Sequence, residues 1–264
     1  MNLISPREKN YLEILARNKA FTFTDEEKVW LPYTSGRVGP YYVDSENVMK
    51  NGKDYLSVIE DLADFLVIKT KYQNEDYVIS GGESKDWFFS SPVASRLGMP
   101  HLAIYKNGRN LGADIKGRKV IHIADLNNEG FSIGGWVPKI RKWGGKINDV
   151  FFFVERDEEG IQVVEDLGLK SHSLVMLNDD RWEYMLKENV ITKEQHASVM
   201  DYRKDKIGWG RKMLDSRQGR DILFKMYVNG NESDNQKAKK ILKNDFYGEE
   251  FMRGLRQSMC VGDI

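Results

Sequence analysis

The segment from Val120 to Ile133 holds the residues of this chain that most clearly suit chemistry. An apolar run ends in Asp125, a polar loop follows, and a helix is expected from Ser132. In an open α/β sheet the loops at the carboxyl ends of strands face a crevice, and a following helix offers unpaired backbone N–H groups to an anion. Asp125 and the turn before the helix therefore suit a sugar phosphate. Glu129, in the same loop, brings a negative charge to a place where a phosphate needs donors.

Composition limits the class of protein and of partner. The chain has 264 residues, 41% of them hydrophobic and 30% charged, which is enough to bury a core as one domain with an appendage. Its Lys and Arg residues number 40, and its Asp and Glu residues also number 40. A chain without net charge has no overall field that attracts nucleic acid or an anionic membrane. We therefore expect neither as a partner.

Cysteine usage and hydropathy favour a cytoplasmic location. Cys260 is the single cysteine, so an internal disulfide is excluded and a reducing compartment is favoured. No apolar run has the length of a membrane span, and the N-terminus lacks the basic and then apolar pattern of a secretory signal.

Short apolar runs alternate with helical patterns through the middle of the chain. Ser5 to Glu8 has a capping box with a first-turn proline, which predicts an opening helix. Aromatic and β-branched residues between Phe21 and Val43 favour short strands or a hairpin arm. Five further strands are expected at 77–80, 101–105, 119–124, 149–154 and 173–177. Helical segments separate them, which predicts right-handed crossovers and a mostly parallel five-stranded sheet in an α/β fold.

After Asp180 the strand patterns stop. Charged helical patterns with narrow apolar stripes follow at 182–187, 193–204, 210–228 and 235–256. We expect this tail to cover another surface or to form an interface.

Four segments in a fixed order carry a further signal. They are Thr34-Ser-Gly-Arg-Val-Gly-Pro-Tyr-Tyr42, Gly81-Gly-Glu83 with Val93–Pro100, Val120–Ser132, and Phe151–Gly160. Together they resemble the type I phosphoribosyltransferases, and specifically the orotate phosphoribosyltransferase branch. The first segment is similar to the hood over the pyrimidine, and the second is similar to the pyrophosphate loop with its helix. The third is similar to the motif that binds phosphoribosyl pyrophosphate, and the fourth to the strand end whose arginine meets the orotate carboxylate.

The resemblance implies a division of the chain into three parts, a phosphoribosyl transfer reaction and a set of site residues. The parts are an N-terminal helix and hood (1–50), a phosphoribosyltransferase-like core (51–180) and a helical extension (181–264). Asp125 would hold the ribose hydroxyls and Mg²⁺, with Lys106 and Arg109 as the other catalytic candidates. The remaining substrate contacts would come from Tyr41, Tyr42, Gly82, Glu83, Asn127, Asn128, Glu129, Gly130, Phe131, Ser132 and Arg156. A homodimer is also implied.

Several positions depart from the family pattern. Ala124 replaces the first of two acids, and Asn128 and Glu129 replace two small hydroxyl residues before the glycine. Tyr105 stands where an arginine is usual before Lys106. The loop that closes over the reaction is shortened to Asn107–Asp114, and the hood has Thr34 in place of a lysine.

These departures leave three functions open. The first is transfer of a phosphoribosyl group to a pyrimidine base. The second is a regulatory protein that keeps the fold, has lost transfer, and binds a nucleotide or another small anion. The third is an enzyme acting on a different substrate, in which Asn128 and Glu129 contact hydroxyl or amine groups.

Overall fold

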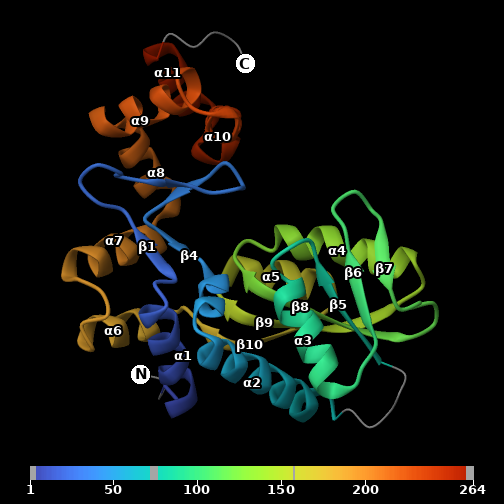
Figure 1. Ribbon diagram of the computed structural model, residues 1–264. Helices are drawn as coiled ribbons and strands as arrows, with labels where there is room; N and C mark the ends of the chain where they lie inside the picture. The colour runs from blue at the N-terminus through green and yellow to red at the C-terminus, as the bar shows by residue number, and fades with distance from the viewer. Residues whose placement is uncertain (1–3, 72–76, 157, 260–264) are drawn as a thin grey trace. The chain divides into compact units, whose positions relative to one another are not determined.

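The computed structural model describes residues 4–71, 77–156 and 158–259, so Cys260 lies outside the described residues. Contacts divide the chain into two compact units (Figure 1). Unit 1 holds the chain up to Ala20 together with Asp44–Tyr184, and unit 2 holds Phe21–Val43 together with the chain from Met185. This grouping differs from the expected division after residues 50 and 180. Buried residues of Phe21–Val43 share a core with the C-terminal helices.

Unit 1 is built on a six-stranded sheet. Its strand order is β10-β9-β8-β5-β6-β7, and every neighbouring pair is parallel except β6 with β7. The strands are β5 (Tyr77–Gly82), β6 (His101–Ile104), β7 (Asn110–Gly112), β8 (Lys119–Asn127), β9 (Lys146–Glu155) and β10 (Lys170–Met176). The α/β class and the mostly parallel sheet are confirmed, with one strand more than expected.

The additional strand lies in a segment whose polar residues predicted only a loop. The backbone N–H of Gly108 donates to the carbonyl of Tyr105 at 3.0 Å, and the N–H of Tyr105 donates to the carbonyl of Arg109 at 2.9 Å. Gly108 has a φ of +86°. An Asn-Gly pair readily forms such a tight turn. The chain therefore folds back at once, and β7 pairs with β6.

Helices cover both faces of the sheet (Figure 1). On one face, Phe65 of α2 contacts Phe151, and Phe89 of α3 contacts Phe153. On the other face, α4 and α5 bury a cluster that includes Ala124 and Trp136. The helices of this unit are α1 (Pro6–Arg17), the 3₁₀ helix η1 (Ser45–Lys50), α2 (Gly52–Thr70), α3 (Trp87–Leu97), α4 (Phe131–Lys142) and α5 (Glu158–Asp166), and α6 (Asp179–Lys187) begins in it.

Unit 2 packs short strands against a helical bundle. Its core joins Trp30, Tyr33 and Val38 to buried residues of the C-terminal helices. The strand pairs are β1 (Phe21–Phe23) with β4 (Tyr41–Val43) and β2 (Leu31–Pro32) with β3 (Val38–Gly39), both antiparallel. The helices are α7 (Lys193–Lys204), α8 (Lys206–Asp215), α9 (Arg217–Val228), α10 (Glu232–Leu242), the 3₁₀ helix η2 (Asp245–Tyr247) and α11 (Glu249–Ser258).

Two of the predicted C-terminal helices are divided in the structure. The side chain of Ser216 accepts a hydrogen bond from the N–H of Gly219, which starts α9 and ends the expected helix 210–228 at that point. The expected helix 235–256 is interrupted between α10 and α11, where Asn244 begins the 3₁₀ helix η2.

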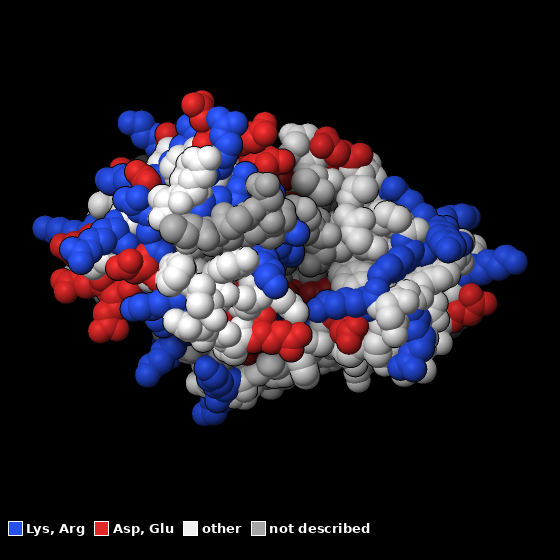
Figure 2. Space-filling view, turned by 90° about the horizontal axis from the view of Figure 1, so that it is seen from above, with Lys and Arg blue, Asp and Glu red and all other residues white. Residues whose placement is uncertain are grey.

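Charged residues of both signs are interspersed over the face drawn in Figure 2, as the equal numbers of acidic and basic residues lead one to expect. Within the described ranges, none of the helices combines the length and the apolar character needed to cross a bilayer.

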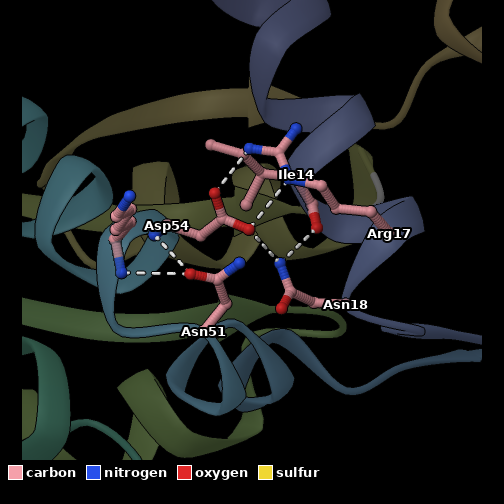
Figure 3. Close-up of polar contacts among 6 residues, drawn as sticks. Ile14, Arg17, Asn18, Asn51 and Asp54 are labelled. Atoms are coloured by element: carbon pink, nitrogen blue, oxygen red, sulfur yellow. Dashed lines mark hydrogen bonds and ion pairs between the residues drawn. The ribbon is translucent and has the colours of Figure 1, made fainter.

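A buried carboxylate fixes α1 to α2 (Figure 3). Asp54 accepts hydrogen bonds from Nε and Nη2 of Arg17 at 2.9 and 2.5 Å and from Nδ2 of Asn18 at 2.6 Å. Asn51 caps α2 through its side chain, which accepts from the N–H groups of Lys53 and Asp54. The hydrogen bonds from Arg17 hold the pKa of Asp54 below its ordinary value. The ionised carboxylate therefore stabilises this helix pair.

We predict that Asp54→Ala lowers the free energy of unfolding by about 2 kcal/mol, because it removes charge-assisted hydrogen bonds to a buried group. Asp64→Ala, at an exposed position of α2, should change it by less than about 0.5 kcal/mol. Since the folded-state pKa of Asp54 is lowered, its contribution is present above the ordinary value of 3.8 and is lost as the pH falls below it. Urea unfolding at several pH values measures both effects. A difference between Asp54→Ala and the natural protein that stays constant down to pH 2 would contradict this account.

Candidate functional site

Asp125 lies at the carboxyl end of β8, and it belongs to the strand and not to the loop that the sequence predicted. The pairing with β9 continues past it, since Leu126 is opposite Val154 and Asn127 is opposite Glu155. The residue is only 7% exposed. Strand β8 therefore ends at Asn127, three residues beyond the expected end at residue 124, and the carboxylate is held by sheet geometry.

The carboxylate of Asp125 lies among other polar groups. Oδ2 of Asp125 accepts a hydrogen bond from Oγ of Ser45 at 2.8 Å. Burial, and then the neighbouring charge of Asp86, raise the pKa of Asp125 to about 8, while Ser45 and the ammonium of Lys85 act in the opposite direction. Lys85 itself pairs with Glu46 at 2.5 Å. Asp125 is thus a buried acid whose ionised form the protein only partly stabilises.

Ala124, where the resemblance would place a first acid, faces the opposite way. Adjacent side chains of a strand point to opposite faces of the sheet, and Ala124 is 2% exposed within the core that α4 and α5 cover. An acid here would be buried among apolar side chains such as Val120 and Phe152. The single acid at the end of β8 therefore follows from the way this core is packed.

Asp86 is a site residue that the sequence reasoning missed. Its Oδ2 accepts a hydrogen bond from the N–H of Gly82 at 3.0 Å, and its Oδ1 accepts from the N–H of Asp125 at 3.4 Å. Nε2 of His122 lies 3.6 Å from Oδ2 of Asp86. Asp86 stands three residues after Glu83 in the sequence. An acidic residue so close to the Gly81–Glu83 segment is the sequence feature that could have identified it as a site residue.

The Gly-Gly pair after the expected strand 77–80 predicts a tight turn, but in the structure both glycines belong to the end of strand β5. Gly81 and Gly82 pair with Ala103 and Ile104 of β6. Gly82 must lack a side chain, because a Cβ there would lie 2.2 Å from the ring of Trp136. The backbone of β5 thereby approaches α4 closely at the same edge of the sheet as Asp125.

Glu83 joins this strand end to the turn that carries the candidate cations. Its Oε2 accepts a hydrogen bond from the N–H of Lys106 at 2.8 Å. The guanidinium of Arg109 lies over the ring of Tyr105 at 4.4 Å. Nζ of Lys139 donates to the carbonyls of Tyr105 and Lys106 at 3.3 and 3.1 Å. The Lys106–Arg109 turn is therefore held in place by both β5 and α4.

The loop between β8 and α4 ends in a glycine with a left-handed conformation. Gly130 has a φ of +74°, and no side chain caps α4. The first-turn N–H groups of Phe131 and Ser132 belong to the set that a helix cannot satisfy internally. Phe131 is 68% exposed, and Ser132 is also exposed. Asn128 and Glu129 are half-buried in this loop.

Asn127 and Arg156 belong to a separate network at the ends of β8, β9 and β10. Oε1 of Glu155 accepts from Nδ2 of Asn127, and Oε2 of Glu155 accepts from Oγ of Ser171, both at 2.6 Å. Burial raises the pKa of Glu155, although both hydrogen bonds lower it. Arg156 is only 3% exposed, and its N–H donates to the carbonyl of Asn127. Asp157, next in the chain, lies outside the described residues.

The two hood tyrosines belong to unit 2. Tyr41 is 1% exposed, and its carbonyl accepts a hydrogen bond from the hydroxyl of Tyr33 at 2.9 Å. Tyr42 is half-buried, and its hydroxyl donates to the carbonyl of Pro32. One of the pair is therefore a core residue. A role for either tyrosine in stacking on a base stays a prediction.

Sequence comparison finds relatives with known activities, although no family model matches the chain. The chain is similar to the orotate phosphoribosyltransferase of Saccharolobus solfataricus, with 28% identity over 200 residues that cover 73% of this chain and 96% of that protein. The orotate phosphoribosyltransferase of Sulfolobus acidocaldarius is 29% identical over 181 residues, which cover 66% of this chain and 89% of that protein.

Solved structures share the architecture. The crystal structure of orotate phosphoribosyltransferase from Francisella tularensis aligns with a TM-score of 0.57 and 20% identity, over 74% of this chain and 98% of that one. Leishmania donovani UMP synthase aligns with a TM-score of 0.64 and 20% identity over 74% of this chain, which spans 42% of that longer protein. The chain has the type I phosphoribosyltransferase fold. The resemblance to the orotate phosphoribosyltransferase branch is confirmed in sequence and fold.

The loop before α4 requires a residue with a left-handed conformation at Gly130, and we predict that Gly130→Ala destabilises the protein by about 1–3 kcal/mol. A Cβ there would lie 2.5 Å from Val163, and the positive φ adds a cost of about 1–2 kcal/mol. Gly134→Ala in α4 is the matched control, because its Cβ would meet nothing within 4 Å. That change should be neutral or stabilise by up to about 1 kcal/mol. Denaturant unfolding measures both, and equal midpoints for the two variants would count against this description of the loop.

Proposed function

We propose that this chain binds phosphoribosyl pyrophosphate at the carboxyl ends of β5 and β8 and transfers the phosphoribosyl group to a pyrimidine base of the orotate type. The similarity to orotate phosphoribosyltransferases over most of their length supports this proposal. The observation that carries it in the structure is the placement of Asp125 at a strand end, directly before the uncapped N-terminus of α4. A carboxylate and a set of backbone donors are what a ribose phosphate requires.

The two ends of the ligand would meet different parts of the site. The 5′-phosphate would lie at the first turn of α4, where backbone N–H groups and the hydroxyl of Ser132 can donate to it. Asp125 would accept hydrogen bonds from the ribose hydroxyls. The diphosphate would lie toward Gly82, next to the turn with Lys106 and Arg109. Glu129 opposes the 5′-phosphate electrostatically and would weaken its binding relative to a loop without this charge.

The residues present are compatible with Mg²⁺ that arrives with the ligand. Among the residues that the structure describes, no three His, Cys, Asp or Glu side chains gather into a protein-only metal cage. Mg²⁺ is, however, commonly held by one or two carboxylates together with substrate phosphates and water. Asp125 would serve as such a ligand, and its raised pKa is the mark of a charge that a cation would offset. A bound Mg²⁺ would neutralise charge on the leaving diphosphate.

The chemistry asked of the protein is mainly positioning and charge stabilisation. The bond between the anomeric carbon and the diphosphate oxygen breaks, and a bond from that carbon to a nitrogen of the base forms. An oxocarbenium-like transition state develops positive charge on the ribose, which the carboxylate of Asp125 can stabilise at close range. Lys106 and Arg109 would stabilise the negative charge on the diphosphate as it leaves. Arg156 as the contact of the base carboxylate stays a prediction.

The similarity to the relatives favours transfer over the two other functions that the sequence left open. A protein with lapsed catalysis and an enzyme for a different substrate would each retain the fold, and the measurement below separates them from the proposed activity.

We predict that the protein consumes orotate when phosphoribosyl pyrophosphate and Mg²⁺ are supplied, and that Asp125→Asn lowers kcat/KM at least about 100-fold by removing the charge opposite the ribose. Asp64→Asn is the matched control, since Asp64 lies at an exposed position of α2 outside the site. Orotate absorbance follows turnover, and calorimetry follows binding. Absence of both heat and turnover at millimolar ligand would refute the proposal.

We also propose that the protein is a homodimer. The resemblance implies this assembly, and α9 exposes 42% of Phe224 and 55% of Val228, which offers apolar surface to a second copy. Light scattering at tens of micromolar should give twice the chain mass of 30.6 kDa. A monomer at that concentration would contradict the proposal. A cytoplasmic location stays a prediction.

A further inference from the structure

The carboxylate of Asp86 is turned away from its own helix. Asp86 precedes α3 at the N-cap position, where an Asp side chain ordinarily accepts from the helix's first N–H groups. Here it makes no such cap, and its backbone is already helical, with φ −58° and ψ −31°. The side chain instead turns back to the sheet and accepts from the N–H of Gly82 and the N–H of Asp125. It thus joins the ends of two parallel strands.

The two N–H groups that Asp86 engages lie where an anionic ligand would need them. Backbone donors at the carboxyl edge of a parallel sheet are the usual partners of ligand phosphates in open α/β folds. One comes from Gly82, at the end of β5, and the other comes from Asp125, at the end of β8. An internal carboxylate therefore holds the place that a phosphate oxygen would take.

The charge of Asp86 is only weakly compensated within the protein. The residue is 8% exposed and lies beside the buried Asp125. Lys85, the adjacent cation in the chain, pairs with Glu46. His122 is fully buried, its Nδ1 lies 3.0 Å from Oγ of Ser80, and its Nε2 has no hydrogen-bond partner and lies 3.6 Å from Oδ2 of Asp86. A buried ring nitrogen directed at a carboxylate in this way marks a polar centre that the fold alone leaves incomplete.

We propose that Asp86 is a specificity-determining residue that excludes metal-free diphosphate from this site and admits diphosphate only as a complex with a divalent cation. A free diphosphate would meet the negative charge of the buried Asp86–Asp125 pair and two occupied donors, and at short range in a poorly solvated site this repulsion outweighs the remaining contacts. A bound cation would reverse the sign of the interaction with both carboxylates. This inference rests on the proposed function for the identity of the anion, but it concerns only the anion half of the ligand.

Inorganic pyrophosphate tests the inference without any transfer reaction. Calorimetry would be run on the full chain with pyrophosphate in EDTA and again with Mg²⁺. For the natural protein we expect binding with Mg²⁺ and binding at least tenfold weaker in EDTA. Asp86→Asn keeps an acceptor for the N–H of Gly82 and removes the charge, so it should bind pyrophosphate at least tenfold tighter than the natural protein in EDTA. The ratio of the pyrophosphate dissociation constant in EDTA to that in Mg²⁺ should therefore be smaller for Asp86→Asn than for the natural protein.

Controls separate a charge effect from a structural one. Asp64→Asn, at an exposed position of α2, should leave the ratio between EDTA and Mg²⁺ unchanged, and thermal unfolding checks that each variant is folded. If Asp86→Asn fails to fold, Asp86→Ser supplies a smaller neutral acceptor for the same comparison. An unchanged ratio in a folded variant, or no pyrophosphate binding by any variant in either condition, would overturn the inference. Orotate turnover by the natural protein reports separately on the proposed function, so failure of one does not imply failure of the other.

Discussion

Two carboxylates buried side by side at the carboxyl edge of the sheet are the interaction on which the rest of the site depends. Asp125 is fixed by strand pairing, and Asp86 is fixed by the backbone donors of β5 and β8. Bringing two acids into a poorly solvated place is unfavourable unless a proton, a cation or hydrogen bonds offset their charge. Ser45 and the more distant charge of Lys85 do so only in part. The pair is therefore left with negative charge that a proton or a bound cation would offset.

The same edge shows how packing on one face of the sheet sets the chemistry on the other. Ala124 is required by the apolar core under α4 and α5, so the acid beside it has no acidic neighbour in the strand. Gly82 is required by the ring of Trp136, which allows β5 to bring its terminal N–H next to Asp125. The second acid then comes from Asp86, at the start of α3. A carboxylate pair is thereby retained, but with a geometry different from two successive acids on one strand.

Much of this arrangement follows from local patterns in the sequence. The capping box of Ser5 and Glu8 begins α1 as predicted, and α7 has the predicted bounds. The strand positions, the parallel pairing and the resemblance to phosphoribosyltransferases were also available from apolar periodicity and segment order. The helix and strand positions depend on contacts between residues that are near in the chain, which a sequence pattern records directly, and the parallel pairing follows from the alternation of strands with helices.

What the sequence could not predict depends on contacts between distant segments. The glycines after Ile79 suggested a turn, but pairing with β6 keeps them in the strand. Asp86 drew no prediction from the sequence, because only the pairing of β8 with β5 gives its carboxylate two backbone donors. Phe21–Val43 packs with helices more than 160 residues away through contacts such as Tyr247 Oη to the N–H of Val38, so no local pattern could assign it to unit 2.

The most direct test of this account is a crystal structure of the chain with phosphoribosyl pyrophosphate and Mg²⁺. The account predicts the diphosphate beside the N–H groups of Gly82 and Asp125, with Asp86 displaced from them or joined to the ligand through the cation. It also predicts the 5′-phosphate at the first turn of α4. A ligand bound elsewhere, with the carboxylate of Asp86 still accepting from Gly82, would contradict it.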